Sequence, residues 1–129
     1  MKASECYERL RLSMDVQEKM PDSMRFLMAE YDKDYEIERR NAASILHIFC
    51  RDIINIPDSE DVSASLELVD LYDCRVCAAS IMQVYSRGLM KALYSLQNGK
   101  YMFGGRDLLT ETELDEIIDN LKKTVHIYT

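Results

Sequence analysis

The sequence predicts an all-α protein: an antiparallel helical bundle of about four helices, with two long central helices and two shorter outer ones. Three observations support this fold class. Four glycines and two prolines in 129 residues leave few positions at which a helix must stop. Apolar residues recur at steps of three and four over long stretches. The connections between these stretches are short, which favours antiparallel neighbours. We expect residues 1–129 to form a single helical-bundle domain.

The first expected helix runs from about Ser4, a good N-cap residue, to about Lys19. Pro21 ends it, because the residue before a proline avoids the helical conformation. The apolar face of this helix contains Ala3, Cys6, Tyr7, Leu10 and Met14.

The two expected central helices span residues 24–54 and 62–96. The first follows a cap at Asp22 or Ser23, with a break near residues 32–34 as the alternative. The second would be roughly 50 Å long and end at Gly99 in the left-handed conformation. The apolar face of 62–96 is made of Val62, Leu66, Val69, Val76, Cys77, Ile81, Val84, Tyr85, Gly88, Leu89, Ala92, Leu93 and Leu96.

The last expected helix begins after Thr110, which with Glu113 forms a capping box. A turn at Gly104 and Gly105 precedes it. Two short helices cannot cover two long ones, so we expect a homodimer that buries the apolar surface left over.

The net charge of −7 disfavours binding to nucleic-acid phosphates and anionic membranes, and it suits a partner protein with a basic surface. No apolar run approaches the ~20 residues of a membrane span, and the first residues show no apolar leader. We therefore expect a cytoplasmic protein with reduced cysteines, no membrane association and no cofactor.

Cys74 and Cys77 form a CxxC pair, a spacing that suits zinc or a redox couple. His47 and Cys50 repeat the spacing on the preceding helix. In the expected hairpin the two pairs would be offset by ~15 Å along the helix axis, far more than a zinc–sulfur bond of ~2.3 Å allows. We expect small core hydrophobes here, with a metal pair at Cys74 and Cys77 as the alternative.

Glu67, Asp70 and Asp73 would lie along one stripe of the third helix, a geometry that can hold Mg²⁺. The ExxD at Glu67 and Asp70 is similar to half of the signature of MazG-like nucleotide pyrophosphatases, which are small helical bundles. The ExxE that the family carries on the preceding helix is not present here.

Arg40, followed by Asn41, and His47 further along the same helix resemble the Rx4–6H motif of HEPN-domain ribonucleases, which are dimeric helical bundles. The resemblance implies that Arg40 would stabilise phosphate charge and that His47 would act in acid–base catalysis. The family motif usually lies near the last helix, whereas this one lies on the second.

A binding surface is expected at two places. One is the aromatic turn Tyr101, Met102 and Phe103, which either forms an exposed contact loop or plugs the end of the bundle. The other is the acidic face of the last helix, with Glu111, Glu113, Asp115 and Glu116.

We therefore expect a small acidic, non-catalytic regulatory protein that binds another protein. One form of this function is an inhibitor whose acidic face imitates nucleic-acid phosphates. The alternative is a helical enzyme acting on nucleotides or RNA, through Glu67 and Asp70 with Mg²⁺ or through Arg40 and His47.

Overall fold

The computed structural model describes residues 1–31 and 35–128, and over these residues it is mostly helical with one small sheet. The helical class is therefore confirmed. The elements in chain order are α1 (Ala3–Ser13), α2 (Asp22–Glu30), α3 (Arg39–Ile48), η1 (Phe49–Ile53), η2 (Ser63–Glu67), η3 (Leu71–Asp73), α4 (Arg75–Ser86), β1 (Tyr94–Ser95), η4 (Gln97–Gly99), β2 (Tyr101–Met102) and α5 (Glu111–Tyr128). None of the helices in these residues is both long and apolar enough to cross a membrane.

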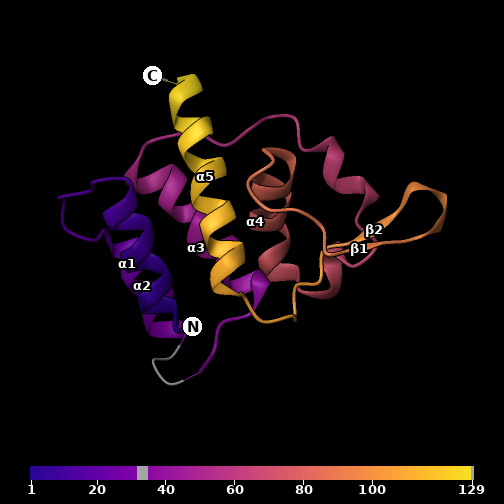
Figure 1. Cartoon of the computed structure of the whole chain (residues 1–129), viewed down its shortest axis with the longest axis horizontal. Helices are drawn as coiled ribbons and strands as arrows, with labels where there is room; N and C mark the ends of the chain where they lie inside the picture. Colours follow the sequence, from indigo (N-terminus) through magenta and orange to yellow (C-terminus); the bar gives the residue numbers. More distant parts are fainter. Residues whose placement is uncertain (32–34, 129) are drawn as a thin grey trace.

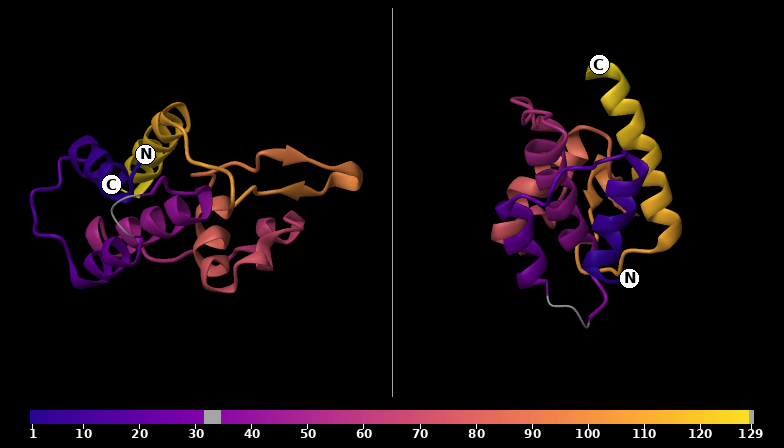
Figure 2. Two further views of the ribbon diagram at one scale, coloured as in Figure 1. Left: turned by 90° about the horizontal axis from the view of Figure 1, so that it is seen from below. Right: turned by 90° about the vertical axis from the view of Figure 1, so that its left-hand side faces the viewer.

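Helix α3 lies at the centre of the fold and contacts α1, α2 and α4. Helix α5 crosses the front of the molecule in Figure 1 and contacts α1. The hairpin of β1 and β2 projects at the end opposite α1 and α2, as Figure 2 shows from below. The molecule therefore has a helical end and an end made of short turns and strands.

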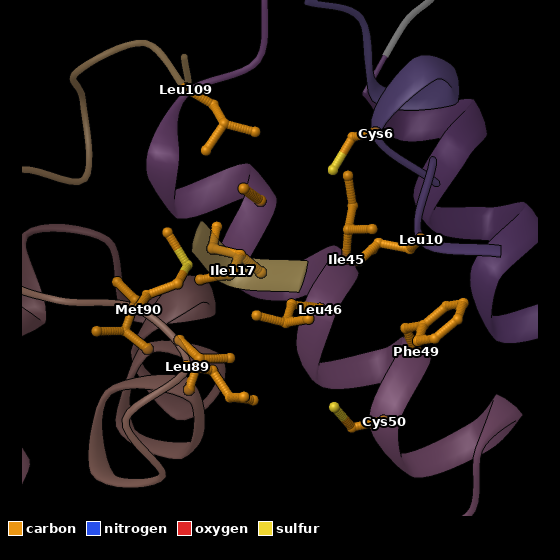
Figure 3. Packing of buried hydrophobic residues seen from close by; sticks show 14 of the residues in the cluster. Cys6, Leu10, Ile45, Leu46, Phe49, Cys50, Leu89, Met90, Leu109 and Ile117 are labelled. Carbon is orange, nitrogen blue, oxygen red and sulfur yellow. The ribbon is translucent and has the colours of Figure 1, made fainter. Parts of the chain in front are cut away.

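The hydrophobic core lies on both sides of α3 (Figure 3). Cys6 and Leu10 of α1 face one side of this helix, and Leu89 and Met90, which follow α4, face the other. Ile117 of α5 closes the core. Burying a side chain of this size stabilises the fold by roughly 1.5–3 kcal/mol, so this core is the main driving force of folding.

The two ends of the chain form helices close to where the sequence predicts them. Helix α5 starts after Thr110, whose Oγ1 accepts a hydrogen bond from the backbone N–H of Glu113 at 3.1 Å. The Glu113 side chain does not complete the capping box, because it pairs with Arg39 instead. Helix α1 ends at Ser13, earlier than predicted, where Asp15 takes a positive φ of 53°.

The prediction of a long second helix over residues 24–54 is wrong. The chain forms the separate helices α2 and α3, and residues 32–34, where a break was the alternative, lie outside the described residues. Helix α3 begins with a capping box between Glu38 and Asn41. It then continues as the π-helical segment η1, in which one extra residue is accommodated per turn.

The prediction of a long third helix is also wrong, and Gly88 explains where helix α4 ends. Helix α4 ends at Ser86, and Gly88 follows with a φ of +74°. The N–H of Gly88 bonds to the carbonyl of Tyr85 at 3.0 Å, and the N–H of Leu89 bonds to that of Val84 at 2.9 Å. This is a Schellman motif with glycine at the left-handed position, which ends the helix well before Gly99.

Gly99 belongs to a hairpin turn instead of a helix end. Asn98 and Gly99 have φ values of 61° and 70°, and they connect β1 with β2. Asn-Gly between two extended segments is the usual sequence of a tight hairpin turn, because both residues tolerate positive φ. Strand β2 also pairs with the extended residue Leu68, so the segment after η2 joins the same small sheet.

Candidate functional site

Cys74 and Cys77 form a disulfide at the start of α4. Cys74 is the N-cap residue, with an extended backbone, and Cys77 lies in the first helical turn. Cys74 is half-buried, whereas Cys77 is only 6% exposed. Cys74 is therefore the more accessible of the two sulfurs, although Cys77 also borders the larger hollow beside the bond.

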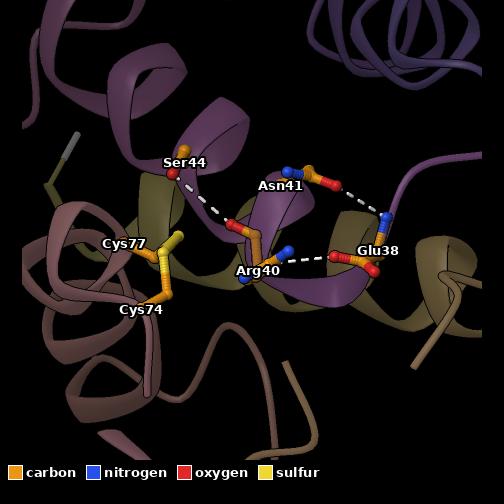
Figure 4. The surroundings of a disulfide bond; sticks show 6 residues. All are labelled: Glu38, Arg40, Asn41, Ser44, Cys74 and Cys77. Atoms are coloured by element: carbon orange, nitrogen blue, oxygen red, sulfur yellow. Dashed lines mark hydrogen bonds and ion pairs between the residues drawn. A yellow bond between two sulfur atoms is a disulfide. The ribbon is translucent and has the colours of Figure 1, made fainter. Parts of the chain in front are cut away.

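Two hollows meet at Cys74. One, of about 130 Å³, lies toward the hairpin and includes Arg40, Tyr94 and Asp107 in its wall. The other, of about 400 Å³, lies toward α2 and includes Arg40 and Val76. Arg40 thus borders both hollows beside the disulfide (Figure 4), with its Nε donating to Glu38 Oε1 at 2.6 Å.

The other two cysteines, Cys6 and Cys50, are buried in the core, as the sequence predicts for small hydrophobic residues. Burial raises the pKa of each thiol to about 12. Since the thiolate is the reactive form, both are chemically quiet at neutral pH. The chain therefore contains one accessible sulfur pair and two protected thiols.

His47 is held in a three-residue network that the sequence did not reveal. Its Nδ1 lies 2.9 Å from the Ser80 hydroxyl and its Nε2 lies 2.8 Å from Asp58 Oδ1. A neutral ring protonated on Nε2 would donate to Asp58 and accept from Ser80. The adjoining hollow of about 10 Å³ has room for at most one water molecule, and the bond between His47 and Ser80 ties α3 to α4.

The alternative of a metal pair at Cys74 and Cys77 is not formed, because these residues are bonded to each other while His47 is held by Ser80 and Asp58. Within residues 1–31 and 35–128, no group of three or more His, Cys, Asp or Glu side chains is arranged to hold a metal ion.

Glu67, Asp70 and Asp73 do not share a helical stripe, because η2 ends at Glu67 and the backbone at Leu68 is extended. Glu67 accepts a hydrogen bond from the Tyr85 hydroxyl at 2.6 Å. The carboxylate of Asp70 accepts the N–H groups of Phe103 at 2.8 Å and Gly104 at 3.0 Å, while Asp73 is exposed. Glu67 and Asp70 therefore each fasten a different segment of the chain.

Arg40 and His47 border different hollows on α3, so the geometry required of a HEPN-like pair is not assembled. The neighbouring Arg39, which sequence reasoning passed over, is fully buried. Arg39 lies three residues before Ala42 and seven before Leu46, which places a cation on the apolar face of the helix. This spacing is the sequence signal that could have identified Arg39.

Arg39 connects three distant parts of the chain. Its guanidinium donates to Glu113 at 2.5 Å, to the Lys91 carbonyl at 2.5 Å and to the Phe103 carbonyl. Its Cζ also lies 4.3 Å from the centroid of the Phe103 ring. This single cation holds the segment between α4 and α5 against α3.

The predicted binding residues are only partly exposed. Phe103 is buried beneath Arg39, and Tyr101 and Met102 are half-buried. On α5, Glu111 and Glu116 are exposed, but Glu113 pairs with Arg39 and Asp115 with Arg9. The chain's own arginines therefore engage part of the acidic face.

Residues 58–73, which we call the acidic–apolar segment, expose large apolar side chains instead. Leu66, Val69 and Tyr72 are 70%, 56% and 63% exposed, and Val76 at the start of α4 is 90% exposed. The segment carries six acidic residues and no Lys, Arg or His: Asp58, Glu60, Asp61, Glu67, Asp70 and Asp73. It leads directly into the disulfide at Cys74.

Compared with protein-family models, with curated proteins and with solved structures, the chain matches none of them.

Proposed function

We propose that this protein is a non-catalytic binding module whose acidic–apolar segment docks a polypeptide segment carrying basic and apolar side chains. The observation that supports this most strongly is the exposure of Leu66, Val69 and Tyr72 in a stretch whose charges are all negative. A partner of this kind would bury the apolar groups and pair with the exposed carboxylates of Glu60, Asp61 and Asp73.

The apolar contribution favours a polypeptide over a small molecule. Fully burying a valine or leucine side chain contributes roughly 1.5–3 kcal/mol, and Leu66 and Val69 lie with Tyr72 within a stretch of seven residues. Charge complementarity raises the association rate and the selectivity more than the affinity. Because salt screens these charges, binding should weaken as salt is added.

The surface has a firm base. The backbone N–H of Val69 bonds to the carbonyl of Tyr101 at 2.9 Å, and Glu67 accepts the hydroxyl of Tyr85 on α4. Because η2 and η3 both contact α4, a partner would meet a surface that is already ordered.

A second copy of the chain is not the occupant we propose. The homodimer was expected because two long helices would have been left partly bare, and those helices are replaced by shorter elements. We also propose residues 58–73, instead of α5, as the acidic surface that contacts the partner. The reason is that Arg39 and Arg9 already pair with Glu113 and Asp115 of α5.

The test measures fluorescence anisotropy of a labelled helical peptide with lysine on one face and leucine on the other. We expect binding that weakens as salt is raised. The double variant Val69→Ser/Tyr72→Ser should bind about tenfold more weakly, equivalent to about 1.4 kcal/mol. A peptide with glutamate in place of lysine should not bind.

The matched control is Leu12→Ser/Phe26→Ser, which removes two exposed apolar side chains from α1 and α2. It should leave the affinity unchanged. Equal weakening by both double variants would contradict the proposal. So would a dimer, detected by sedimentation, that Tyr72→Ser dissociates, because a second copy would then occupy the surface.

A further inference from the structure

The disulfide lies beside the proposed docking surface, with Cys77 in the hydrophobic core and Cys74 packed against the edge of that core. Val76, the most exposed of the large apolar residues, borders the same hollow as Cys74. Tyr72 precedes Cys74 by two residues. A polypeptide seated on residues 66–76 would therefore bring its own side chains to the accessible sulfur.

The two sulfurs occupy unequal places. Cys74 caps the helix and is half-buried, whereas Cys77 is nearly enclosed within the first turn. Backbone N–H groups at the start of a helix favour a negative charge at the N-cap, which is the position of Cys74. Cys74 is therefore the sulfur that reacts, both as the site of attack on the disulfide and as the thiolate of the reduced pair.

Charged groups around Cys74 are of both signs. Arg40 and Arg106 border the hollow on the hairpin side, together with Asp70, Asp73 and Asp107. Glu30 and Arg40 border the hollow on the α2 side. Arg40 is the one cation common to both hollows, so it is placed to attract an incoming thiolate to the disulfide.

We propose that Cys74 and Cys77 are a redox-active pair that exchanges disulfide and dithiol with cysteines of the docked polypeptide. A partner thiolate attacks Sγ of Cys74, the bond between Cys74 and Cys77 breaks, and Cys77 leaves as a thiolate. A second thiolate of the partner then attacks the partner's sulfur in the mixed disulfide, and Cys74 is released. The partner loses two electrons and two protons, and the pair gains them as two thiols. The reverse sequence oxidises the pair and reduces the partner.

This inference rests on the proposed function only for the identity of the partner, because the exchange chemistry can be tested with small thiols. The intact protein would be equilibrated in mixtures of reduced and oxidised glutathione, quenched with acid, alkylated and weighed by mass spectrometry. We expect Cys74 and Cys77 to change state together while the protein stays folded, and Cys6 and Cys50 to stay unmodified.

Single variants test which sulfur is attacked. Reduced Cys77→Ser should form a mixed disulfide with oxidised glutathione at Cys74. Reduced Cys74→Ser should react at Cys77 at least about tenfold more slowly, because Cys77 is buried. The Cys6→Ser/Cys50→Ser variant should behave like the unmodified protein, and circular dichroism checks the folding of each.

The contribution of Arg40 is tested in the Cys77→Ser background. Arg40→Gln should slow alkylation of Cys74 by iodoacetamide several-fold, and Arg40→Lys, which keeps the charge, should restore most of the rate.

Two results would overturn the inference. One is reduction of the disulfide only when the protein unfolds, and the other is equal reactivity of the two single variants. Failure of the docking proposal looks different: exchange with glutathione would persist, but Val69→Ser/Tyr72→Ser would not slow exchange with a basic, apolar peptide that contains two cysteines.

Discussion

The core around α3 and the loop between α4 and α5, residues 88–110, are held in place by different interactions. Apolar side chains from α1, α3, α4 and α5 make most of the core. The 88–110 loop buries a few apolar groups, and its backbone also bonds to two charged side chains from other parts of the chain, Arg39 and Asp70. Apolar periodicity records the first kind of contact and says nothing about the second.

The backbone of α3 also depends on this loop. The first N–H groups of the helix, at Arg39 and Arg40, bond to the carbonyls of Asp107 at 2.7 Å and Gly105 at 2.9 Å. The loop thus satisfies donors that every helix leaves open at its start. The core and the loop are different in construction but joined at one helix end.

The largest effect is expected from Arg39→Met, which keeps much of the apolar stem but removes the cation. Glu113 would lose its partner, and the carbonyls of Lys91 and Phe103 would lose their donors. Removing one partner of a buried ion pair costs about 3–5 kcal/mol. Urea unfolding measures the loss, and hydrogen exchange should show amides of the 88–110 loop opening first.

Leu46→Ala is the matched control for the core, with an expected cost of about 2–5 kcal/mol from the cavity it leaves. In Leu46→Ala, the amides of the 88–110 loop should exchange only as fast as the lowered global stability allows. If the two variants gave the same exchange pattern, the distinction between core and loop would fail.

A smaller effect is expected from Asp70→Asn. The amide side chain offers one acceptor oxygen where the carboxylate offers two, so the N–H of Phe103 or of Gly104 loses its bond. The cost should be about 1–3 kcal/mol. Faster hydrogen exchange at these two amides would be the direct readout. Asp73→Asn, three residues along and exposed, should leave both amides protected.

The smallest effect concerns Asp52, which joins the π-helical segment to α2 through Ser23 Oγ at 2.7 Å. A hydrogen bond from Arg51, and then the bond from Ser23, lower the pKa of this carboxyl below its usual range. Its stabilising contribution is therefore present above pH 4 and is lost as the pH falls through the lowered pKa.

For this partly exposed group we expect less than about 1 kcal/mol. Asp52→Asn should be less stable than the original protein at neutral pH, and the two should converge in acid when urea unfolding is measured across pH. A difference that grew in acid would have the wrong sign.

Sequence reasoning located the helices whose signals are local. Thr110 as a cap and the apolar steps after it were enough for α5, and Pro21 separated α1 from α2. The long helix over 62–96 failed because exposed residues such as Val69 and Val76 continued the apolar period by coincidence. Gly88 was counted as part of an apolar face, although its positive φ ends α4.

The candidate site was half predictable. The CxxC spacing singled out Cys74 and Cys77. It did not predict that they lie at the start of a helix, because the expected helix ran from 62 to 96. The roles of Arg39, Asp58 and Ser80 follow from contacts between residues far apart in the chain, which no local pattern contains. The predicted aromatic turn is strand β2 followed by Phe103, and only tertiary structure decides that Phe103 is buried.

The side chain of Arg39 reaches groups 52, 64 and 74 positions later in the chain. Closing loops of that size is slow compared with forming a helix, because chain entropy must be lost before any contact compensates for it. During synthesis, residue 39 must wait for Glu113 to emerge before its charge is matched. The last helix therefore sets the moment at which folding can be completed.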